Sequence, residues 1–203
     1  HLSLRRQRQM CIRDRYNTLD TIVWMAEFND SRRVVNITKS LAQYFRLALN
    51  QGQEQILLRD EIDHVRQYLF IQKQRYGEKL NYEILEDERL GDYQLPKLVL
   101  QPLVENAIYH GIKEIDRPGL IRVTTEVSGD SACVSIFDNG QGFDLSGSTD
   151  QPLLRLGGVG LKNVDQRLRL QFGEAYHMEI DSKANSYTKI TLYLPLSSGD
   201  ESS

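Results

Sequence analysis

The chain has 203 residues, of which 40% are hydrophobic and 26% are charged, so it can bury one ample hydrophobic core or two small ones. Its 25 basic and 28 acidic residues give a net charge of -3, which argues against nucleic acid as a partner. The cysteines Cys11 and Cys133 match no metal-binding or redox spacing, and no apolar stretch reaches about 18 residues, so neither a disulfide framework nor a membrane span is expected within the chain.

Residues 1–15 differ from the rest of the chain. They contain five arginines against a single acid, and they show no apolar stripe at helical spacing. We favour a disordered or artefactual segment here, and the alternative is a basic arm that touches anionic lipid. The pattern typical of folded protein begins at Tyr16.

Three amphipathic helices are predicted next. Apolar residues at three- and four-residue spacing mark them around residues 19–26, 34–48 and 58–76. Helices of this kind cannot bury their apolar stripes alone, and a hairpin of two is readily completed by a second copy into a four-helix bundle. A homodimer is therefore expected.

From residue 80 the period of the pattern changes. The sequence predicts strands at residues 80–84, 121–127, 132–137, 178–181 and 189–194, and helices at residues 95–111 and 159–172. This arrangement favours an α+β fold, in which the helices cover one face of a mixed sheet.

The first of three polar motifs is ENAIYHG at residues 105–111. An asparagine amide oxygen is a hard ligand suited to Mg²⁺, and a neighbouring carboxylate can orient one of the waters of the ion. Asn106 and Glu105 are therefore candidate metal ligands. Taken alone, the motif is equally typical of a solvated helix face.

The second motif is DNGQG at residues 138–142, directly after an apolar predicted strand. Asp138 could accept a hydrogen bond from an exocyclic amine such as that of adenine, while Gly140 and Gly142 let the backbone pass close to a flat ring. The alternative is a plain turn, because Asp-Asn-Gly is a common turn signal.

The third motif is GGVGLKN at residues 157–163, where a helix is predicted to begin. Gly157, Gly158 and Gly160 would expose backbone N–H groups to a phosphate at the positive end of that helix. Residues 143–156 are rich in Gly, Ser and Asp and are expected to form a mobile lid over a nucleotide. A P-loop is excluded because Gly-Lys-Ser/Thr does not occur.

Together these motifs resemble the Asn box and the two glycine boxes of the Bergerat-fold ATPases, which include gyrase, histidine kinases and MutL. Several stretches are similar in particular to the LytS/YesM type of sensor histidine kinase. They are LQPLVENA at residues 100–107, GLKNV at 160–164 followed by Arg167 and Leu168, RYG at 75–77, and YNTLD at 16–20. The last of these resembles the end of the phosphoacceptor motif Asn-Pro-His-Phe-Leu-Tyr-Asn of that family.

The resemblance implies a helical dimerisation hairpin followed by a Bergerat-fold α/β sandwich. The implied division is a basic segment at residues 1–15, a dimerisation and phosphotransfer region at 16–78, an ATP-binding catalytic domain at 79–196 and a polar tail at 197–203.

The resemblance also implies roles for individual residues. Asn106 would bind the Mg²⁺ that bridges the ATP phosphates, with Glu105 in support, and Asp138 would hold the adenine amine. The further nucleotide-binding positions that it implies are His110, Gly140, Gly142, Gly157, Gly158, Gly160, Leu161 and Asn163. Asn17, in the segment that resembles the phosphoacceptor motif, joins Glu105, Asn106 and His110 in the implied catalytic set.

The implied activity is that of an ATP-dependent protein-histidine kinase. Such proteins autophosphorylate a histidine, often between the subunits of a homodimer, and pass the phosphoryl group to a response regulator. The chain would be the cytoplasmic part of a protein anchored in the bacterial membrane by an upstream segment. Hydrolytic relatives carry a glutamate one helical turn before the Asn, where this chain has Pro102, so transfer is favoured over a gyrase- or MutL-like ATPase.

One departure from the family pattern concerns the phosphoacceptor. Counting back from Tyr16 places the expected histidine at position 13, where this chain has Arg13. Arginine stays protonated and cannot be the nucleophile. His64 is expected to be structural, and His1 and His177 lack the surrounding motif. The sequence therefore predicts Mg-ATP binding without autophosphorylation of the chain as it stands, and a degenerate nucleotide-binding dimerisation scaffold remains an alternative.

Overall fold

The computed structural model describes residues 31–48, 54–144 and 159–196, together with Ile22 and Ala26. The basic segment 1–15, most of the first expected helix, nearly all of the expected lid and the tail 197–203 lie outside the described residues.

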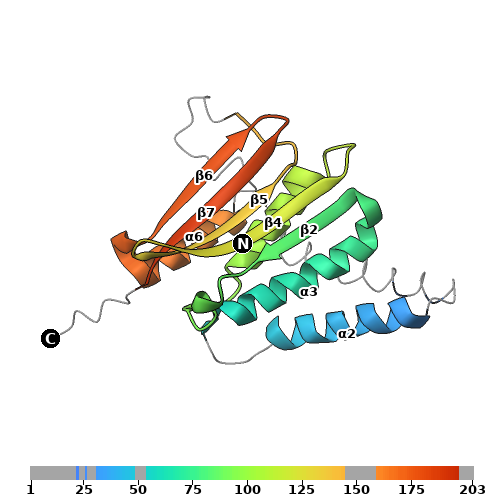
Figure 1. Ribbon diagram of the computed structural model, residues 1–203, viewed down its shortest axis with the longest axis horizontal. Coiled ribbons are helices and arrows are strands. Elements are labelled where there is room, and N and C mark those ends of the chain that lie inside the picture. The colour runs from blue at the N-terminus through green and yellow to red at the C-terminus, as the bar shows by residue number, and fades with distance from the viewer. Residues whose placement is uncertain (1–21, 23–25, 27–30, 49–53, 145–158, 197–203) are drawn as a thin grey trace.

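A five-stranded mixed sheet forms one layer of the molecule, in the order β2-β4-β5-β7-β6 (Figure 1). Its strands are β2 (Leu80–Leu85), β4 (Gly119–Ser128), β5 (Ser131–Asp138), β6 (His177–Lys183) and β7 (Tyr187–Pro195). Strand β2 runs parallel to β4, and the other neighbours are antiparallel. A parallel pair needs a long crossover between its strands, and here that crossover carries one of the expected functional helices.

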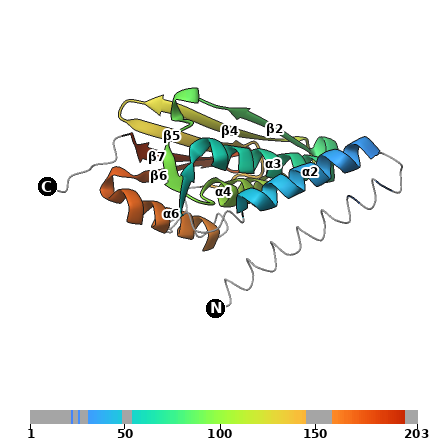
Figure 2. The same ribbon diagram turned by 90° about the horizontal axis from the view of Figure 1, so that it is seen from below.

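The helices form a second layer on one face of this sheet (Figure 2). They are α3 (Leu58–Tyr76), α4 (Leu100–Asn106) and α6 (Val159–Phe172), and α4 continues directly as a π-helix, η3 (Ala107–Ile112). A further helix, α2 (Ser31–Ala48), packs against the outside of α3. Short 3₁₀ turns are η1 (Gly77–Lys79), η2 (Glu88–Leu90) and η4 (Gly173–Ala175). The predicted α+β fold, with helices on one face of a mixed sheet, is confirmed.

The core lies between these two layers. Alternate residues of β4 and β5, among them Val123, Val134 and Ile136, point inward and are buried. They belong to one hydrophobic cluster with Leu69 of α3 and Leu103 of α4. Full burial of an aliphatic side chain contributes about 1.5–3 kcal/mol, so this cluster is a large source of stability for the helix layer.

Helix α2 packs on α3 rather than on the sheet (Figure 1). Ile37 of α2 is fully buried and shares a small cluster with Ile71 of α3. Helix α3 is thus covered on both sides, by α2 and by the main core. Within the described part of the chain, no helix has the length and apolar character that crossing a bilayer requires.

The expected helix at residues 95–111 begins later than predicted. A short strand β3 (Gln94–Pro96) pairs antiparallel with β1 (Gln55–Leu57), and α4 starts only at Leu100. Proline disfavours helical backbone in the residue before it, which suits an extended Leu95. Leu98 then adopts a positive φ of 56°, so the chain turns before the helix begins.

Glu61 of α3 fixes the start of α4. Its side chain is 0% exposed, and its two oxygens accept hydrogen bonds from Leu98 N at 2.9 Å and Leu100 N at 3.0 Å. These N–H groups precede or open a helix and would otherwise be unpaired in the core. Burial raises the pKa of this carboxyl, against the lowering effect of the backbone hydrogen bonds. A residue nearly forty positions earlier in the sequence therefore sets where the functional helix begins.

Candidate functional site

One end of the inward face of the sheet is polar. The strand register aligns Asp138 of β5 with Thr188 of β7, and Thr188 with Ser182 of β6. The next inward row contains Ile136, Ile190 and Ile180, and it is apolar throughout. All three polar residues are buried. The sheet thus presents a carboxyl and two hydroxyl groups where its hydrophobic face ends.

A cavity of about 150 Å³ opens at this polar end. Its lining combines Asn106, His110 and Gly111 from α4 and η3 with Asp138, Gln141, Gly142, Phe143 and Thr188 from the sheet and the turn after β5. Segments that are far apart in the sequence therefore meet around one small polar space.

The π-helix brings the helical side of the cavity into place. Its wider turn is shown by Lys113 N, which donates to Ile108 O five residues back at 2.9 Å. Turns of this kind are rare and often occur at functional sites. Gln141 N donates to Gly111 O at 3.2 Å, so the turn after β5 is tied to η3.

Glycines allow this close approach. A Cβ atom at Gly111 would collide with the carboxylate of Asp138, and one at Gly140 would collide with the backbone of Gly111. Gly142 has a φ of +55°, and a Cβ there would overlap the carbonyl of Lys183. The DNGQG turn therefore needs its glycines for packing against η3 and the β6–β7 turn, as well as for any ligand.

The carboxyl of Asp138 is the main electrostatic feature of the cavity. It is 3% exposed, and Gly140 N donates to its Oδ1 at 2.9 Å. Burial raises the pKa of this carboxyl to about 7, although the hydrogen bond from Gly140 opposes the shift. A buried carboxyl that has one donor among the described residues and a raised pKa, at a cavity wall, marks a candidate binding site for a hydrogen-bond donor.

Known proteins are similar to this chain in sequence and in fold. The family model described as "Histidine kinase-, DNA gyrase B-, and HSP90-like ATPase" matches residues 91–198, and that described as "Histidine kinase" matches residues 15–80. The chain belongs to the histidine kinase-, DNA gyrase B- and HSP90-like ATPases. Within this family, the predicted similarity to the LytS/YesM type of sensor histidine kinase is confirmed by the relatives that follow.

Three curated relatives are similar over most of the chain. Sensor histidine kinase YesM of Bacillus subtilis is 33% identical over 182 residues, which are 89% of this chain and 31% of the relative. Sensor histidine kinase BtsS of Escherichia coli is 35% identical over 180 residues, with the same shares. Sensor protein LytS of Streptococcus agalactiae is 32% identical over 188 residues, 89% of this chain and 32% of the relative. The chain therefore spans about a third of the length of these proteins.

Solved structures of histidine kinases have the same fold. The histidine kinase domain of the Erythrobacter litoralis blue-light-activated kinase EL346 matches with a TM-score of 0.54 and 16% identity, over 88% of this chain and 87% of that one. Acinetobacter baumannii AdeS matches with a TM-score of 0.50 and 16% identity, over 86% and 84% of the two chains. At these identities the likeness concerns the fold alone.

In this member of the ATPase family, the structure brings some of the expected site residues together. Asn106, His110, Asp138 and Gly142 all line the cavity. Asn106 is buried and ends α4, whereas His110 is exposed at the rim. Gly140 is not among the described residues that line the cavity, but its N–H donates a hydrogen bond to the carboxyl of Asp138.

Other expected residues lie elsewhere. The half-buried Glu105 is not among the described residues that line the cavity, and its Oε1 accepts a hydrogen bond from Gln101 Nε2 at 2.6 Å. Gly160 and Leu161 lie in the first turn of α6 and Asn163 follows in the next turn, with the Leu161 side chain buried in the main core. The expected site residues Asn17, Gly157 and Gly158 lie outside the described residues.

Sequence reasoning missed Thr188. Its Oγ1 lies 3.2 Å from Ser182 Oγ, which accepts a hydrogen bond from Phe143 N and donates one to Tyr187 O. The hydroxyl of Thr188 therefore lies in a hydrogen-bonded group at the cavity wall. A signal was present in the sequence, because Thr188 is the first inward position of a strand whose later inward residues are apolar. Only the register with β5 placed it beside Asp138.

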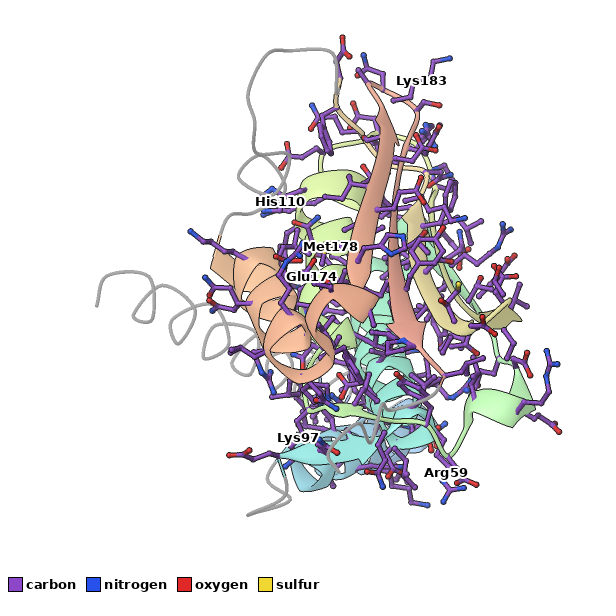
Figure 3. All side chains as sticks on the ribbon, turned by 90° about the vertical axis from the view of Figure 1, so that its left-hand side faces the viewer. Arg59, Lys97, His110, Glu174, Met178 and Lys183 are labelled. Carbon is purple, nitrogen blue, oxygen red and sulfur yellow. The ribbon has the colours of Figure 1, made fainter. Side chains whose placement is uncertain are left out.

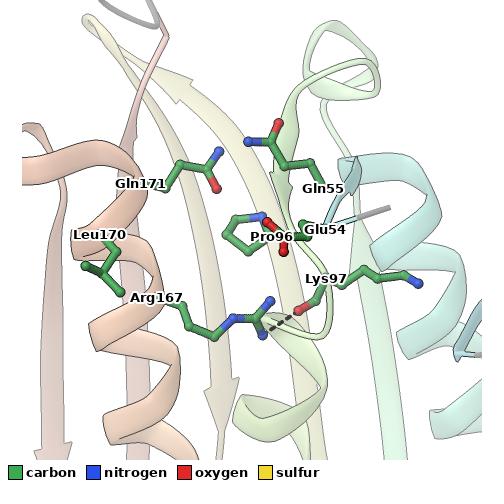
Figure 4. Close-up of a pocket in the computed structure, with 7 residues that line it drawn as sticks. All are labelled: Glu54, Gln55, Pro96, Lys97, Arg167, Leu170 and Gln171. Carbon is green, nitrogen blue, oxygen red and sulfur yellow. Dashed lines mark hydrogen bonds between the residues drawn. The ribbon is translucent and has the colours of Figure 1, made fainter. Parts of the chain in front are cut away.

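A larger cavity, of about 510 Å³, lies beside the C-terminal half of α6, where Leu170 and Gln171 line it (Figure 4). It contains none of the expected site residues, and Arg167 at its edge donates to Lys97 O at 2.7 Å. In Figure 3, Lys97 and Arg59 lie at one end of the molecule, with Lys183 at the other and His110 in between. The chemical groups that line it, rather than its volume, make the smaller cavity the candidate site.

Proposed function

We propose that this chain is the kinase core of a two-component sensor histidine kinase. It binds Mg-ATP at the cavity between η3 and the DNGQG turn, supports phosphorylation of a histidine within a homodimer, and serves transfer to the receiver domain of a response regulator. The observation that carries the proposal is that Asn106 and Asp138, two of the polar residues most typical of the family, line the same small cavity.

The residues of the cavity fit a magnesium nucleotide. Magnesium neutralises phosphate charge and prefers oxygen ligands, and Asn106 would provide an amide oxygen from the end of α4. Glu105 would orient a water of the ion from the adjacent position. The carboxyl of Asp138 has a single backbone donor among the described residues, so it retains acceptor capacity for the amine of an adenine base.

The base and the phosphates of the nucleotide would be held by different groups. Thr188 would add a hydroxyl beside Asp138 at the base, while His110 would approach the phosphates from the rim of the cavity. Gly157, Gly158 and Gly160 would offer backbone N–H groups at the start of α6, together with Leu161 and Asn163. The buried side chain of Leu161 leaves its backbone as the group that could contribute.

Transfer to a side chain is favoured over hydrolysis. Pro102 lies in the first turn of α4, one helical turn before Asn106, and it cannot activate water. This position argues against a gyrase- or MutL-like ATPase. The two functional regions of the proposal remain residues 16–78 for dimerisation and phosphotransfer, including Asn17, and residues 79–196 for ATP binding.

The remaining partners belong to the whole protein. The chain spans 31% of the length of YesM, so we place the signal-sensing part outside this chain, anchored in the bacterial membrane, with the present chain on its cytoplasmic side. The second candidate function is a nucleotide-binding dimerisation scaffold. Arg13 favours it, because an arginine stands where the acceptor histidine is expected.

Radiolabelled ATP tests the proposal. The chain as it stands should bind Mg-ATP and gain no acid-labile phosphate. A variant that carries Cys11→Asn, Ile12→Pro, Arg13→His, Asp14→Phe and Arg15→Leu restores the acceptor motif of the family and should become labelled on position 13. Adding Asn106→Ala to that variant should abolish the labelling.

Each other outcome has a distinct meaning. Binding of ATP without labelling of the restored variant would support the scaffold. Release of phosphate to water at a rate comparable with family ATPases would support the hydrolytic alternative. No binding of ATP at all would overturn the assignment of the cavity.

A further inference from the structure

Gln101 connects the helix α2 to the carboxylate beside Asn106. Its side-chain nitrogen donates to the hydroxyl of Tyr44 in α2 at 2.7 Å and to Oε1 of Glu105 at 2.6 Å. An amide nitrogen carries two hydrogens, so both hydrogen bonds can exist at the same time. Gln101 and Glu105 are four residues apart on α4 and share a helix face. A continuous polar contact thus runs from α2 to the residue next to the cavity.

Ring stacking fixes the α2 end of this contact. The ring of Tyr44 lies on that of His64 in α3, with centroids 4.5 Å apart and an angle of 15° between the planes, and the ring of Tyr68 lies 6.1 Å away. His64 is 2% exposed, and its Nε2 has no hydrogen-bond partner among the described residues. Burial lowers the pKa of His64 to about 4, with a further contribution from the charge of Lys97, so the imidazole is neutral at neutral pH. The stack therefore holds Tyr44 without placing a cation near Glu105.

The hydrogen bond that Glu105 accepts from Gln101 is short, at 2.6 Å. A glutamate side chain loses rotamer freedom when it is held in one orientation, and a short hydrogen bond opposes that loss. Removal of the Gln101 amide would therefore weaken the hold on this rotamer of Glu105.

We propose that Gln101 and Tyr44 are positioning residues for Glu105, and that α2 must be docked on α3 and α4 for this carboxylate to be correctly oriented. The inference rests on the proposed function, because it assigns Glu105 a part in phosphoryl transfer. It adds a physical link between the helical region and the site. A displacement of α2 would withdraw the Tyr44 hydroxyl, loosen Gln101 and slow transfer without altering the base pocket at Asp138.

The first test measures transfer and binding separately in the restored acceptor variant described above. Gln101→Ala should lower the rate of phosphohistidine formation by about 10- to 100-fold, since displacement of a catalytic group by about 1 Å can have an effect of this size. Tyr44→Phe should lower it by a smaller factor. The dissociation constant for Mg-ATP should stay within about twofold, because a loss confined to the transition state leaves ground-state binding intact.

Two comparisons separate positioning from general destabilisation. Tyr93→Phe removes a tyrosine hydrogen bond of similar length, to Pro195 O at 2.8 Å, outside the network of Gln101, and it should leave transfer unchanged. Tyr44→Phe should have no further effect once Gln101→Ala is present, because both act through one contact. Equal transfer in the parent, Gln101→Ala and Tyr44→Phe would overturn the proposal, as would a loss equally large in Tyr93→Phe.

A second measurement does not require transfer. In ¹⁵N-labelled chain, the side-chain amide of Gln101 should give two proton signals; Tyr44→Phe should shift one of them and Glu105→Ala the other. If the restored variant is not phosphorylated, the proposed function fails. The bridging contact is then decided by these signals alone, and unchanged signals in both variants would overturn it.

Discussion

Glu61 and Asp138 are both buried carboxylates, but their hydrogen bonding differs. Glu61 is 0% exposed and both of its oxygens accept backbone N–H groups, whereas Asp138 is 3% exposed and, within the described part of the chain, only its Oδ1 accepts a hydrogen bond, from Gly140 N. Burial raises the pKa of each. A buried charge is tolerated when hydrogen bonds compensate its lost hydration. The two hydrogen bonds to Glu61 stabilise the start of α4, and the single one that the described residues give to Asp138 is consistent with remaining acceptor capacity at the cavity.

The largest effect is expected for Glu61→Ala. This change leaves the N–H groups of Leu98 and Leu100 unpaired, at roughly 1–3 kcal/mol each, so the free energy of unfolding should fall by roughly 2–6 kcal/mol. Urea denaturation measures it. The exposed Glu114→Ala is the matched control and should change the free energy by less than about 0.5 kcal/mol. Equal effects would show that Glu61 is not a structural cap.

Asp138→Asn should lower the affinity for ATP without lowering the free energy of unfolding. The affinity for ATP should fall by about 1–3 kcal/mol, measured by calorimetry at pH 8, because the charged acceptor is lost. The free energy of unfolding should not decrease, since an amide keeps an oxygen for Gly140 N and removes the cost of a buried charge. The exposed Asp116→Asn should leave both quantities unchanged. Unchanged ATP affinity in Asp138→Asn would argue against the adenine assignment.

The pH dependence of binding follows from the raised pKa of Asp138, about 7. Below that pH a proton occupies the carboxyl and competes with a donated amine, so ATP affinity should fall by about tenfold per pH unit and level off above about pH 8. The ATP phosphates also titrate, so Asp138→Asn provides the baseline to subtract. An identical pH dependence in both proteins would contradict the prediction.

The contribution of the same carboxyl to stability has the opposite sign. The folded protein holds this proton more tightly than the unfolded chain, whose ordinary aspartate pKa is 3.8. This group therefore adds to the free energy of unfolding as the pH falls from about 7 toward 4, and its contribution is lost as the pH rises through 7. The difference in unfolding free energy between the parent and Asp138→Asn, measured across this range, should show that slope.

The smallest effect is expected for Thr188→Val. Loss of one hydroxyl at the cavity wall should weaken ATP binding by about 0.5–1.5 kcal/mol. Thr191→Val is the control, because Thr191 lies in the same strand on the opposite face of the sheet and is not among the lining residues. Calorimetry with both variants decides whether the hydroxyl of Thr188 belongs to the site.

Local patterns predicted much of this protein. Alternation and helical spacing indicated the strands of the sheet and the helices α3 and α6, because the apolar side chains of these elements must face one core. The sequence motifs and the family resemblance also predicted Asn106, His110, Asp138 and Gly142 as nucleotide-binding residues. All four line one cavity. Such predictions depend only on residues that are close together in the sequence, so they can be made without the tertiary structure.

Contacts between distant segments decided the rest. The start of α4 at Leu100 depends on Glu61, the place of Thr188 beside Asp138 depends on strand register, and the orientation of Glu105 depends on Gln101 and Tyr44. The π-helix likewise allows Gly111 to lie against Asp138. The sequence by itself determined the residue types of the motifs and the local periods of the helices and strands, and it predicted candidate nucleotide-binding residues, since these features lie in short stretches of the chain. Only the tertiary structure decided which hydrogen-bond partners each buried polar group has among the described residues, because those partners come from other elements.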